Sequence, residues 1–239
     1  MNIALIGNGK MGRMIESLCE KDDALHVAGF VGPNDHASLD EIEDVDVAVD
    51  FSYPGNLDDL LACALARRMP LVIGTTGLSA EQGEAIRRAS KEIPIVWVNN
   101  YSTGVTVLCR LVRMAAQTLG DEFDIEIVET HHNQKADAPS GTAKALLACV
   151  DPTHDYDVVY GREGQPGKRG HEIGVHALRG GTVAGEHSVH FFGQMEEIEL
   201  RHRADSREIF ARGALKAAAF VVKAEPGLYD MEDVLFGGH

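Results

Sequence analysis

The chain has 239 residues, of which 37 are acidic and 22 are Lys or Arg, so its formal net charge is −15. This length allows one large domain or two modest ones. A surface of this charge repels nucleic acid and anionic lipid. No apolar run approaches the ~20 residues that span a bilayer, and the N-terminus lacks the basic segment of a signal peptide. We therefore expect a cytoplasmic protein with neither a nucleic-acid nor a membrane partner.

The first hundred residues alternate short apolar runs with amphipathic stretches. Strands are predicted at 3–6, 25–31, 46–51, 71–73 and 95–98, and helices at 11–21, 57–69 and 80–91. The strands are apolar almost throughout, which is typical of a parallel sheet covered on both faces. We therefore predict an α/β fold with an N-terminal Rossmann-type parallel sheet.

The pattern changes after residue 102. A helix is predicted at 105–119, followed by strands at 124–128, 158–160, 173–177, 188–192 and 196–202, and by an Ala-rich helix at 207–224. Strict alternation in EEIELRH favours antiparallel pairing with one exposed face. We predict a second α+β domain on a mixed, largely antiparallel sheet. Residues 1–102 with 213–239 would bind a dinucleotide, and 103–212 would bind substrate and form the oligomer.

A glycine loop follows the first strand directly and opens the first helix. Its six residues are Gly7, Asn8, Gly9, Lys10, Met11 and Gly12. The GxGxxG spacing allows a tight turn, close approach of backbone N–H groups to a pyrophosphate, and close helix–strand packing. An ordinary tight turn is the alternative, and the βαβ context favours the dinucleotide site.

Three further strands end in unusual loops. Phe51 closes the third strand, Gly74, Thr75 and Thr76 follow the fourth, and Asn99, Asn100 and Tyr101 follow the fifth. Cofactors lie outside the carboxyl ends of parallel strands, so we expect these loops to line the nicotinamide end. Turn formation alone is the other interpretation of each loop.

The choice between NADH and NADPH stays open. Gly32 stands where an acidic residue would end the second strand to bind the ribose, and Asp35 lies slightly further on. Asp35 is either a ribose ligand or a turn residue. The absence of a nearby Arg for a 2′-phosphate slightly favours NADH.

The densest cluster of reactive side chains follows the strand at 124–128. His131, His132 and Lys135 precede Ser140, Gly141 and Thr142, which begin an apolar helix. The first-turn amides of this helix and its dipole can hold a carboxylate or phosphate, and the side chain of Asp137 or Ser140 can cap its N-terminus. The three basic side chains can transfer protons. A capped surface loop is the alternative. A metal site is less favoured because adjacent strand residues point to opposite faces and HExxH is absent.

No other pattern indicates a metal. The four cysteines, Cys19, Cys63, Cys109 and Cys149, form no CxxC pair and lie in apolar, helix-like stretches. Small buried thiols in a reducing compartment are expected, rather than disulfides or zinc ligands.

The sequence resembles the 4-hydroxy-tetrahydrodipicolinate reductase (dihydrodipicolinate reductase) family along its whole length. The specific stretch is ETHHNQKADAPSGTA, and GNGKMG, VIGTTG, NNYSTGV, GREG, GEHSV and GLYDMEDVL occur in the same order. The chain is similar to the shorter form of the family. Its glycine loop is GxGxxG, whereas the family often has a longer form.

The resemblance implies roles for individual residues. His131 would be the general acid/base, Lys135 a second proton donor and His132 a substrate contact, while Gly141 and Thr142 would donate to a substrate carboxylate. The cofactor loops would be Gly7 to Gly12, Gly74 to Thr76 and Val98 to Tyr101, with Tyr101 keeping a ring contact where the family often has Phe. A homotetramer joined mainly through the second sheet is also implied.

The resulting expectation is NADH- or NADPH-dependent reduction of a small dicarboxylate, 4-hydroxy-tetrahydrodipicolinate, in diaminopimelate and lysine biosynthesis. Hydride would come from nicotinamide and a proton from His131 or Lys135. Two alternatives stay open: a Rossmann-type dehydrogenase of another small anionic substrate, and a non-catalytic nicotinamide-sensing protein.

Overall fold

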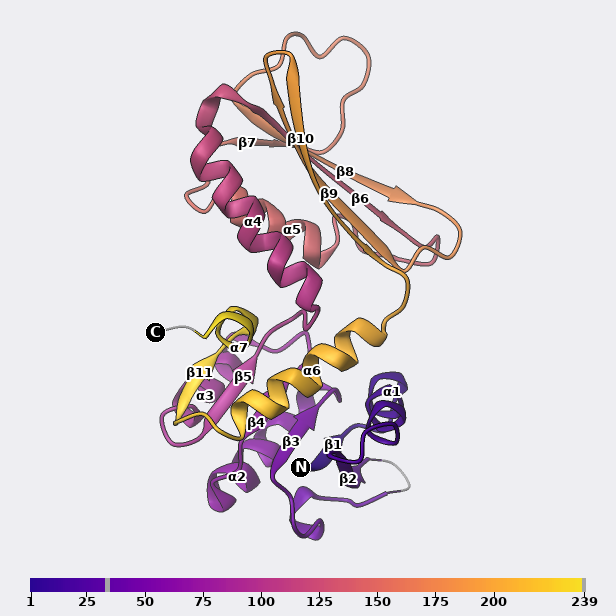
Figure 1. Ribbon diagram of the computed structural model, residues 1–239, viewed down its shortest axis with the longest axis vertical. Helices are drawn as coiled ribbons and strands as arrows, with labels where there is room; N and C mark the ends of the chain where they lie inside the picture. The colour runs from indigo at the N-terminus through magenta and orange to yellow at the C-terminus, as the bar shows by residue number, and fades with distance from the viewer. Residues whose placement is uncertain (33–34, 238–239) are drawn as a thin grey trace. The chain divides into compact units, whose positions relative to one another are not determined.

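A computed structural model describes residues 1–32 and 35–237 (Figure 1). The chain forms two compact units. Unit 1 comprises Met1–Thr103 together with Glu208–His239, and unit 2 comprises Gly104–Arg207. No helix in the described ranges is long and apolar enough to cross a bilayer.

Unit 1 is built on a six-stranded sheet with the order β11-β5-β4-β3-β1-β2, in which every neighbouring pair is parallel. The strands are β1 (Asn2–Ile6), β2 (His26–Val31), β3 (Val47–Asp50), β4 (Leu71–Ile73), β5 (Pro94–Trp97) and β11 (Gly227–Tyr229). The Rossmann-type parallel sheet predicted from the sequence is therefore confirmed. The strand β11 extends the sheet beyond the five strands that were predicted.

Helices cover both faces of this sheet. One face packs against α1 (Lys10–Cys19), α6 (Glu208–Val221) and α7 (Met231–Phe236), and the other against α2 (Leu57–Arg67) and α3 (Ala80–Ala89). Side chains alternate accordingly, because Ile3 and Leu5 of β1 face the first layer whereas Ala4 and Ile6 face the second. Figure 1 shows α6 lying across the central strands, where its small residues pack closely. Short 3₁₀ helices η1 (Leu39–Glu41) and η2 (Pro54–Asn56) lie in the connections.

Unit 2 is built on a five-stranded sheet with the order β10-β9-β6-β8-β7. Its strands are β6 (Asp124–His131), β7 (Asp157–Val159), β8 (Glu172–Arg179), β9 (Gly185–Gly193) and β10 (Glu196–Ala204). The sheet is mixed, as predicted, and its antiparallel pairing is the more extensive. Pairs β10–β9 and β9–β6 are antiparallel, and β6–β8 and β8–β7 are parallel. The parallel half follows from the helical crossover between β6 and β7, since such a connection returns the chain in the same direction.

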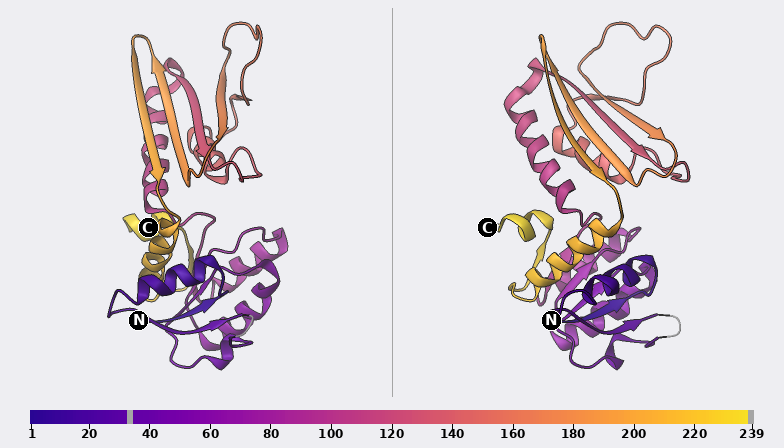
Figure 2. Two further views of the ribbon diagram at one scale, coloured as in Figure 1. Left: turned by 90° about the vertical axis from the view of Figure 1, so that its right-hand side faces the viewer. Right: turned by 45° about the vertical axis from the view of Figure 1, so that its right-hand side comes forward.

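One face of the second sheet is covered by two helices, α4 (Thr103–Leu119) and α5 (Gly141–Val150), and η3 (Gly120–Glu122) follows α4. The core between them contains Leu108, Val112 and Leu146 from the helices and Ile127 and Val189 from the strands. Both views in Figure 2 draw these helices on the same side of the sheet. The opposite face carries polar and charged side chains together with partly exposed apolar ones.

Candidate active site

The last residues of strand β6 place Glu129 and His131 on the helix-covered face, because side chains two residues apart share a face. Both are removed from solvent, with Glu129 fully buried and His131 9 % exposed. His131 Nδ1 lies 2.5 Å from Glu129 Oε2. The imidazole is therefore held by a carboxylate of its own strand.

Glu129 has hydrogen bonds on both of its carboxylate oxygens. Arg179 donates Nη1 to Oε2 at 2.8 Å and Nη2 to Oε1 at 2.9 Å, and the backbone N–H of Ser140 donates to Oε1 at 3.0 Å. Burial would raise the pKa of Glu129, but the hydrogen bonds from Arg179, His131 and Ser140 outweigh it and lower the pKa. Glu129 is thus ionised and accepts only, so His131 carries its proton on Nδ1 and leaves Nε2 for other chemistry.

The neighbourhood of His131 Nε2 is kept clear by Gly185, the first residue of β9. A Cβ at this position would lie 3.1 Å from His131 Nε2. Any side chain at residue 185 would therefore crowd the nitrogen that is free to exchange a proton. This glycine begins the GEHSV stretch that the chain shares with the family it resembles.

Ser140 links the start of α5 to a second histidine. Its Oγ accepts from the backbone N–H of Ala143 at 3.2 Å and lies 3.0 Å from His187 Nε2. Burial, followed by repulsion from His131, lowers the pKa of His187 to about 4. His187 is therefore neutral near pH 7, and its ring packs edge-on against that of His131 with 5.1 Å between centroids.

The predicted substrate groups are distributed around this helix start. Gly141 and Thr142 are the first two residues of α5, at the end of the helix where its dipole favours an anion. Lys135 lies in the preceding loop, with Nζ 2.8 Å from Asp137 Oδ1, and His132 is partly buried beside it. Arg179 Nη2 also donates to the Asp137 carbonyl at 2.7 Å, which fixes the loop to β8. Ser140 is buried and engaged in capping, so its backbone contributes more to this site than its hydroxyl.

Sequence reasoning assigned no role to Glu129, Arg179, His187 or Gly185. Glu129 and His187 lie inside family motifs, and β-alternation could have paired Glu129 with His131. Arg179 is brought to the site because β8 pairs in parallel with β6 and sets Arg179 opposite His131. That pairing joins residues 48 positions apart, which no local pattern indicates.

The glycine loop of unit 1 has the geometry that a pyrophosphate site requires. Gly7 has φ +96°, and a Cβ on Gly12 would collide with the Gly7 carbonyl, so both positions need glycine. Gly9 has open space beside it and is the N-cap of α1, where no side chain caps the helix. Lys10 and Met11 begin that helix. The loop therefore fits the phosphates of a dinucleotide.

The loops after β3 and β4 pack closely together. The Phe51 ring occupies the space that a Cβ of residue 74 would need, so this position must be glycine. Thr75 is buried and its Oγ1 accepts from the Ser52 N–H at 3.0 Å, whereas Thr76 is exposed. Burial raises the pKa of the neighbouring Asp50 carboxyl, although hydrogen bonds from Ser52 and Thr75 oppose the shift.

The loop after β5 is only partly available to a cofactor. Asn99 is exposed, Val98 and Asn100 are partly buried, and Asn100 Oδ1 accepts from the Ser102 N–H at 2.9 Å. Tyr101 is 2 % exposed, and its hydroxyl donates to the Ile73 carbonyl at 2.8 Å. Its ring packs edge-on against Phe51. The buried ring of Tyr101 thus supports Phe51 from the core instead of offering a surface of its own.

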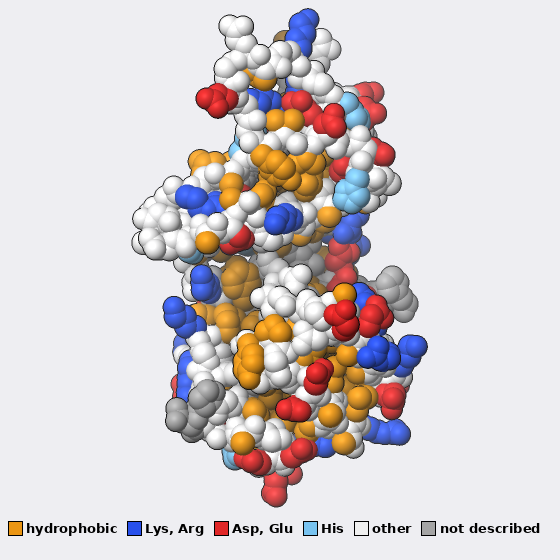
Figure 3. Space-filling view, turned by 180° about the vertical axis from the view of Figure 1, so that it is seen from behind, with side chains coloured by type: hydrophobic (Ala, Val, Ile, Leu, Met, Phe, Trp, Pro, Cys, Tyr) orange, Lys and Arg blue, Asp and Glu red, His pale blue; other side chains and the backbone are white. Residues whose placement is uncertain are grey.

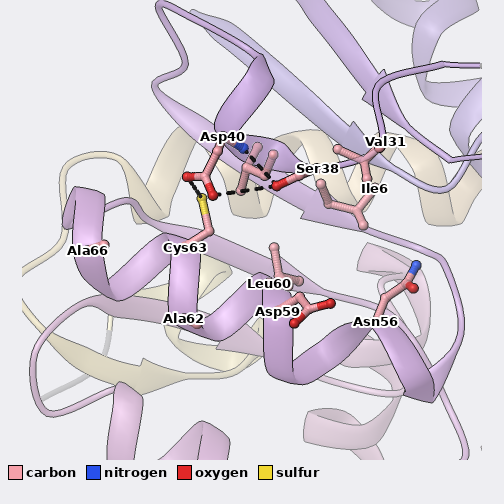
Figure 4. A pocket seen from close by; sticks show the side chains of 12 residues that line it. Ile6, Val31, Ser38, Asp40, Asn56, Asp59, Leu60, Ala62, Cys63 and Ala66 are labelled. Carbon is pink, nitrogen blue, oxygen red and sulfur yellow. Dashed lines mark hydrogen bonds between the residues drawn. The ribbon is translucent and has the colours of Figure 1, made fainter.

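A cavity of about 380 Å³ lies at the carboxyl ends of β1 and β2, beside the glycine loop. Figure 4 shows apolar side chains from Ile6, Val31 and Leu60 with polar groups at its rim. The polar lining residues are Ser38, Asp40, Asn56, Asp59 and Cys63. Asp35 lies near the same strand ends, where its Oδ2 accepts from Asn8 Nδ2 of the glycine loop at 2.6 Å.

Cys63 in this cavity wall donates its Sγ–H to Asp40 Oδ1 at 2.9 Å, as Figure 4 shows. Burial and this carboxylate raise its pKa to about 11, so the thiol is protonated and unreactive near pH 7. All four cysteines are free. Within residues 1–32 and 35–237, no three His, Cys, Asp or Glu side chains are grouped so as to hold a metal ion.

A parallel nucleotide-binding sheet with a phosphate-ready glycine loop, joined to an α+β unit with a buried acid–base cluster, defines a Rossmann-type oxidoreductase. The chain belongs to the dihydrodipicolinate reductase family. Residues 1–101 match the model described as Dihydrodipicolinate reductase, N-terminus, and residues 104–235 match the model for its C-terminus. The family resemblance predicted from the motifs is therefore confirmed.

Named relatives match this chain over nearly its whole length. The 4-hydroxy-tetrahydrodipicolinate reductase of Alkaliphilus oremlandii is 43 % identical over 239 residues, covering 98 % of each chain. The protein of that name from Caldanaerobacter subterraneus is 45 % identical over 242 residues, covering 97 % of this chain and 96 % of the relative. A solved dipicolinate-bound dihydrodipicolinate reductase from Paenisporosarcina sp. TG-14 has a TM-score of 0.79 at 20 % identity and covers 99 % of each chain, which supports the fold.

Proposed function

We propose that this chain catalyses the NAD(P)H-dependent reduction of 4-hydroxy-tetrahydrodipicolinate to tetrahydrodipicolinate, the activity for which its relatives are named. In a cell it would act in the cytoplasm, in the diaminopimelate and lysine pathway. The observation that carries the proposal is the cluster at the end of β6. An imidazole held by an ionised carboxylate lies beside a helix start that is suited to a substrate carboxylate.

The substrate is a dianion, and a chain of net charge −15 must hold it with local groups. The basic side chains on the face drawn in Figure 3 are scattered, with no single large basic patch. One carboxylate would accept from the amides of Gly141 and Thr142, where the α5 dipole favours an anion. The other would lie between His132 and Lys135. The dipicolinate bound to the Paenisporosarcina reductase is a dicarboxylate of this kind.

The proton of the reaction would come from His131 Nε2 or from Lys135. Glu129 holds the imidazole through Nδ1, which directs Nε2 away from the carboxylate. A bound nicotinamide would supply the hydride. The proton leaves with the displaced hydroxide as water, so one hydride and one proton are consumed for each water released. Fixing both carboxylates holds the reacting carbon in one orientation, an effect that can supply up to about 7–11 kcal/mol.

The cofactor would bind unit 1 through the glycine loop, with the loops at Phe51, Gly74–Thr76 and Val98–Tyr101 at the nicotinamide end. The cavity beside Ile6 and Val31 is suited to the adenosine half, since it lies at the carboxyl ends of β1 and β2. NADH and NADPH both remain candidates. The carboxylates of Asp35, Asp40 and Asp59 favour NADH, because they would repel a 2′-phosphate.

A coupled assay tests the proposed function. The purified chain would be mixed with the product of the upstream synthase, formed in situ, and oxidation of NADH and of NADPH would be followed. We expect turnover with this substrate and at least about tenfold lower kcat/KM with a panel of other small keto and imino acids. Cofactor binding without turnover of any of these substrates would favour a nicotinamide-sensing protein, and faster turnover of another acid would favour a different dehydrogenase.

A further inference from the structure

We propose that Glu129 is a positioning residue that couples the proton donor His131 to the anion-binding start of α5, with Arg179 holding Glu129 in place. The proposal rests on the proposed function for the chemistry at His131. Glu129 is fully buried, and the proposal follows from how the two oxygens of this one carboxylate are used.

Each oxygen of Glu129 serves a different part of the site. Oε2 accepts from His131 Nδ1 at 2.5 Å, and Oε1 accepts from the N–H of Ser140 at 3.0 Å. Ser140 is the N-cap of α5, immediately before the two amides proposed to bind a substrate carboxylate. A single rigid group therefore sets the imidazole and the helix start relative to one another.

Arg179 completes this arrangement from the neighbouring strand. It donates to both oxygens of Glu129 and also to the carbonyls of Asp137 and Leu178, each at 2.7 Å. Such a buried ion pair adds little net stability, because desolvation offsets much of the Coulomb attraction. Its bidentate geometry instead fixes the carboxylate plane, which is the property that a positioning group requires.

The groups around His131 come from several elements. Glu129 shares strand β6, Arg179 approaches from β8, and His187 packs from β9. Lys135 in the loop and His202 on β10 act on His187 through space. His187 is neutral near pH 7. Among the described residues, Glu129 is the one negative group with a contact to His131.

The substitution Glu129→Gln tests the coupling. Glutamine keeps the shape but has one acceptor oxygen where Glu129 uses two, so it cannot accept from both His131 Nδ1 and the Ser140 N–H. It also removes the negative charge that lies against His131 Nδ1. We expect kcat to fall about 10–100-fold, because the imidazole and the helix start are no longer held in one geometry.

The matched control is Glu126→Gln. Glu126 lies on the opposite face of the same strand, where it accepts from Arg162 at 2.7 and 3.1 Å and lies 2.7 Å from His176 Nε2. This variant removes the same charge from a similar Glu–Arg–His cluster without contacting His131. We expect its kcat to match that of the wild type.

A measurement independent of turnover separates this proposal from the proposed function. In the full chain labelled with ¹⁵N-histidine, the His131 resonance is assigned by its loss in His131→Gln. We expect neutral His131 to be protonated on Nδ1 in the wild type and in Glu126→Gln, and to show mixed tautomers in Glu129→Gln. Arg179→Gln should also give mixed tautomers, and it replaces Glu129→Gln in this test if that variant does not fold.

An Nδ1-protonated His131 in both Glu129→Gln and Arg179→Gln would overturn the positioning role, as would a kcat that Glu126→Gln lowers as far as Glu129→Gln does. If the wild type reduces none of the substrates, the proposed function fails, yet the tautomer measurement still decides whether Glu129 positions His131.

Discussion

At the scale of single residues, the two units differ in what their charges can do. In unit 2, Glu129 is buried and fully hydrogen-bonded, so its charge acts on His131. In unit 1, Asp35 is exposed and reaches the glycine loop through Asn8. The first arrangement prepares a proton donor, and the second places negative charge where a cofactor ribose would bind.

We predict that Asp35→Asn lowers the ratio of kcat/KM for NADH to that for NADPH by about tenfold, since it removes a charge that would repel the 2′-phosphate. Steady-state kinetics with both cofactors on the same substrate measure this ratio. Asp23→Asn, an exposed acid of unit 1 in the turn before β2, is the control and should leave it unchanged. A wild type that prefers NADPH, or an unaltered ratio in Asp35→Asn, would contradict the assignment.

At the scale of secondary-structure elements, the contact between β9 and α5 depends on His187 staying neutral. The folded protein holds this pKa at about 4, whereas an unfolded chain has an ordinary value of about 6.5. Between these values the unfolded state binds more protons, so lowering the pH through this window destabilises the fold.

Urea titrations should therefore show the free energy of unfolding falling between about pH 7 and 5, with a contribution from His187 on the order of 2 kcal/mol. Glu129 contributes in the same direction, but only nearer its own ordinary pKa of about 4.3. In His187→Asn the fall in the free energy of unfolding between pH 7 and 5 should be smaller by that amount. An equal pH dependence in the variant and the wild type would show that His187 is not buried as neutral imidazole.

Most elements could be predicted from the sequence, because apolar runs and helical periodicity are local signals. The parallel sheet of unit 1, the helices on its faces and the start of α5 at Ser140–Thr142 agree with that prediction. Alternation within β10 predicted its antiparallel pairing, but it says nothing about the parallel pairing of β8 with β6. Arg179 and His187 reach the site through strand pairing over long sequence separations, and no motif of adjacent residues reveals such contacts.

At the scale of the whole molecule, the uncovered face of the second sheet is the expected site of self-association. It carries two large apolar side chains, Phe192 and Leu178, which are 40 % and 49 % exposed. The family resemblance implies a homotetramer through this sheet. Burying these side chains between copies would account for their exposure in the single chain.

Light scattering should give a mass about four times the 25.8 kDa of one chain. Phe192→Asp should lower it, because a carboxylate cannot be buried unpaired at an interface. Met114→Asp on α4, an apolar side chain that is 60 % exposed, is the control and should keep the wild-type mass. A monomeric wild type at micromolar concentration, or a Phe192→Asp variant of unchanged mass, would contradict self-association through this face of the sheet.

Replacing His131 by Gln tests the proposed reductase and its proton donor most directly, with Lys135→Ala measured beside it. Turnover of 4-hydroxy-tetrahydrodipicolinate should fall about 10²–10⁴-fold in kcat if these groups donate protons. Calorimetric affinity for dipicolinate should change little in His131→Gln, because the helix start of α5 remains. Near-wild-type kcat in both variants would contradict the account.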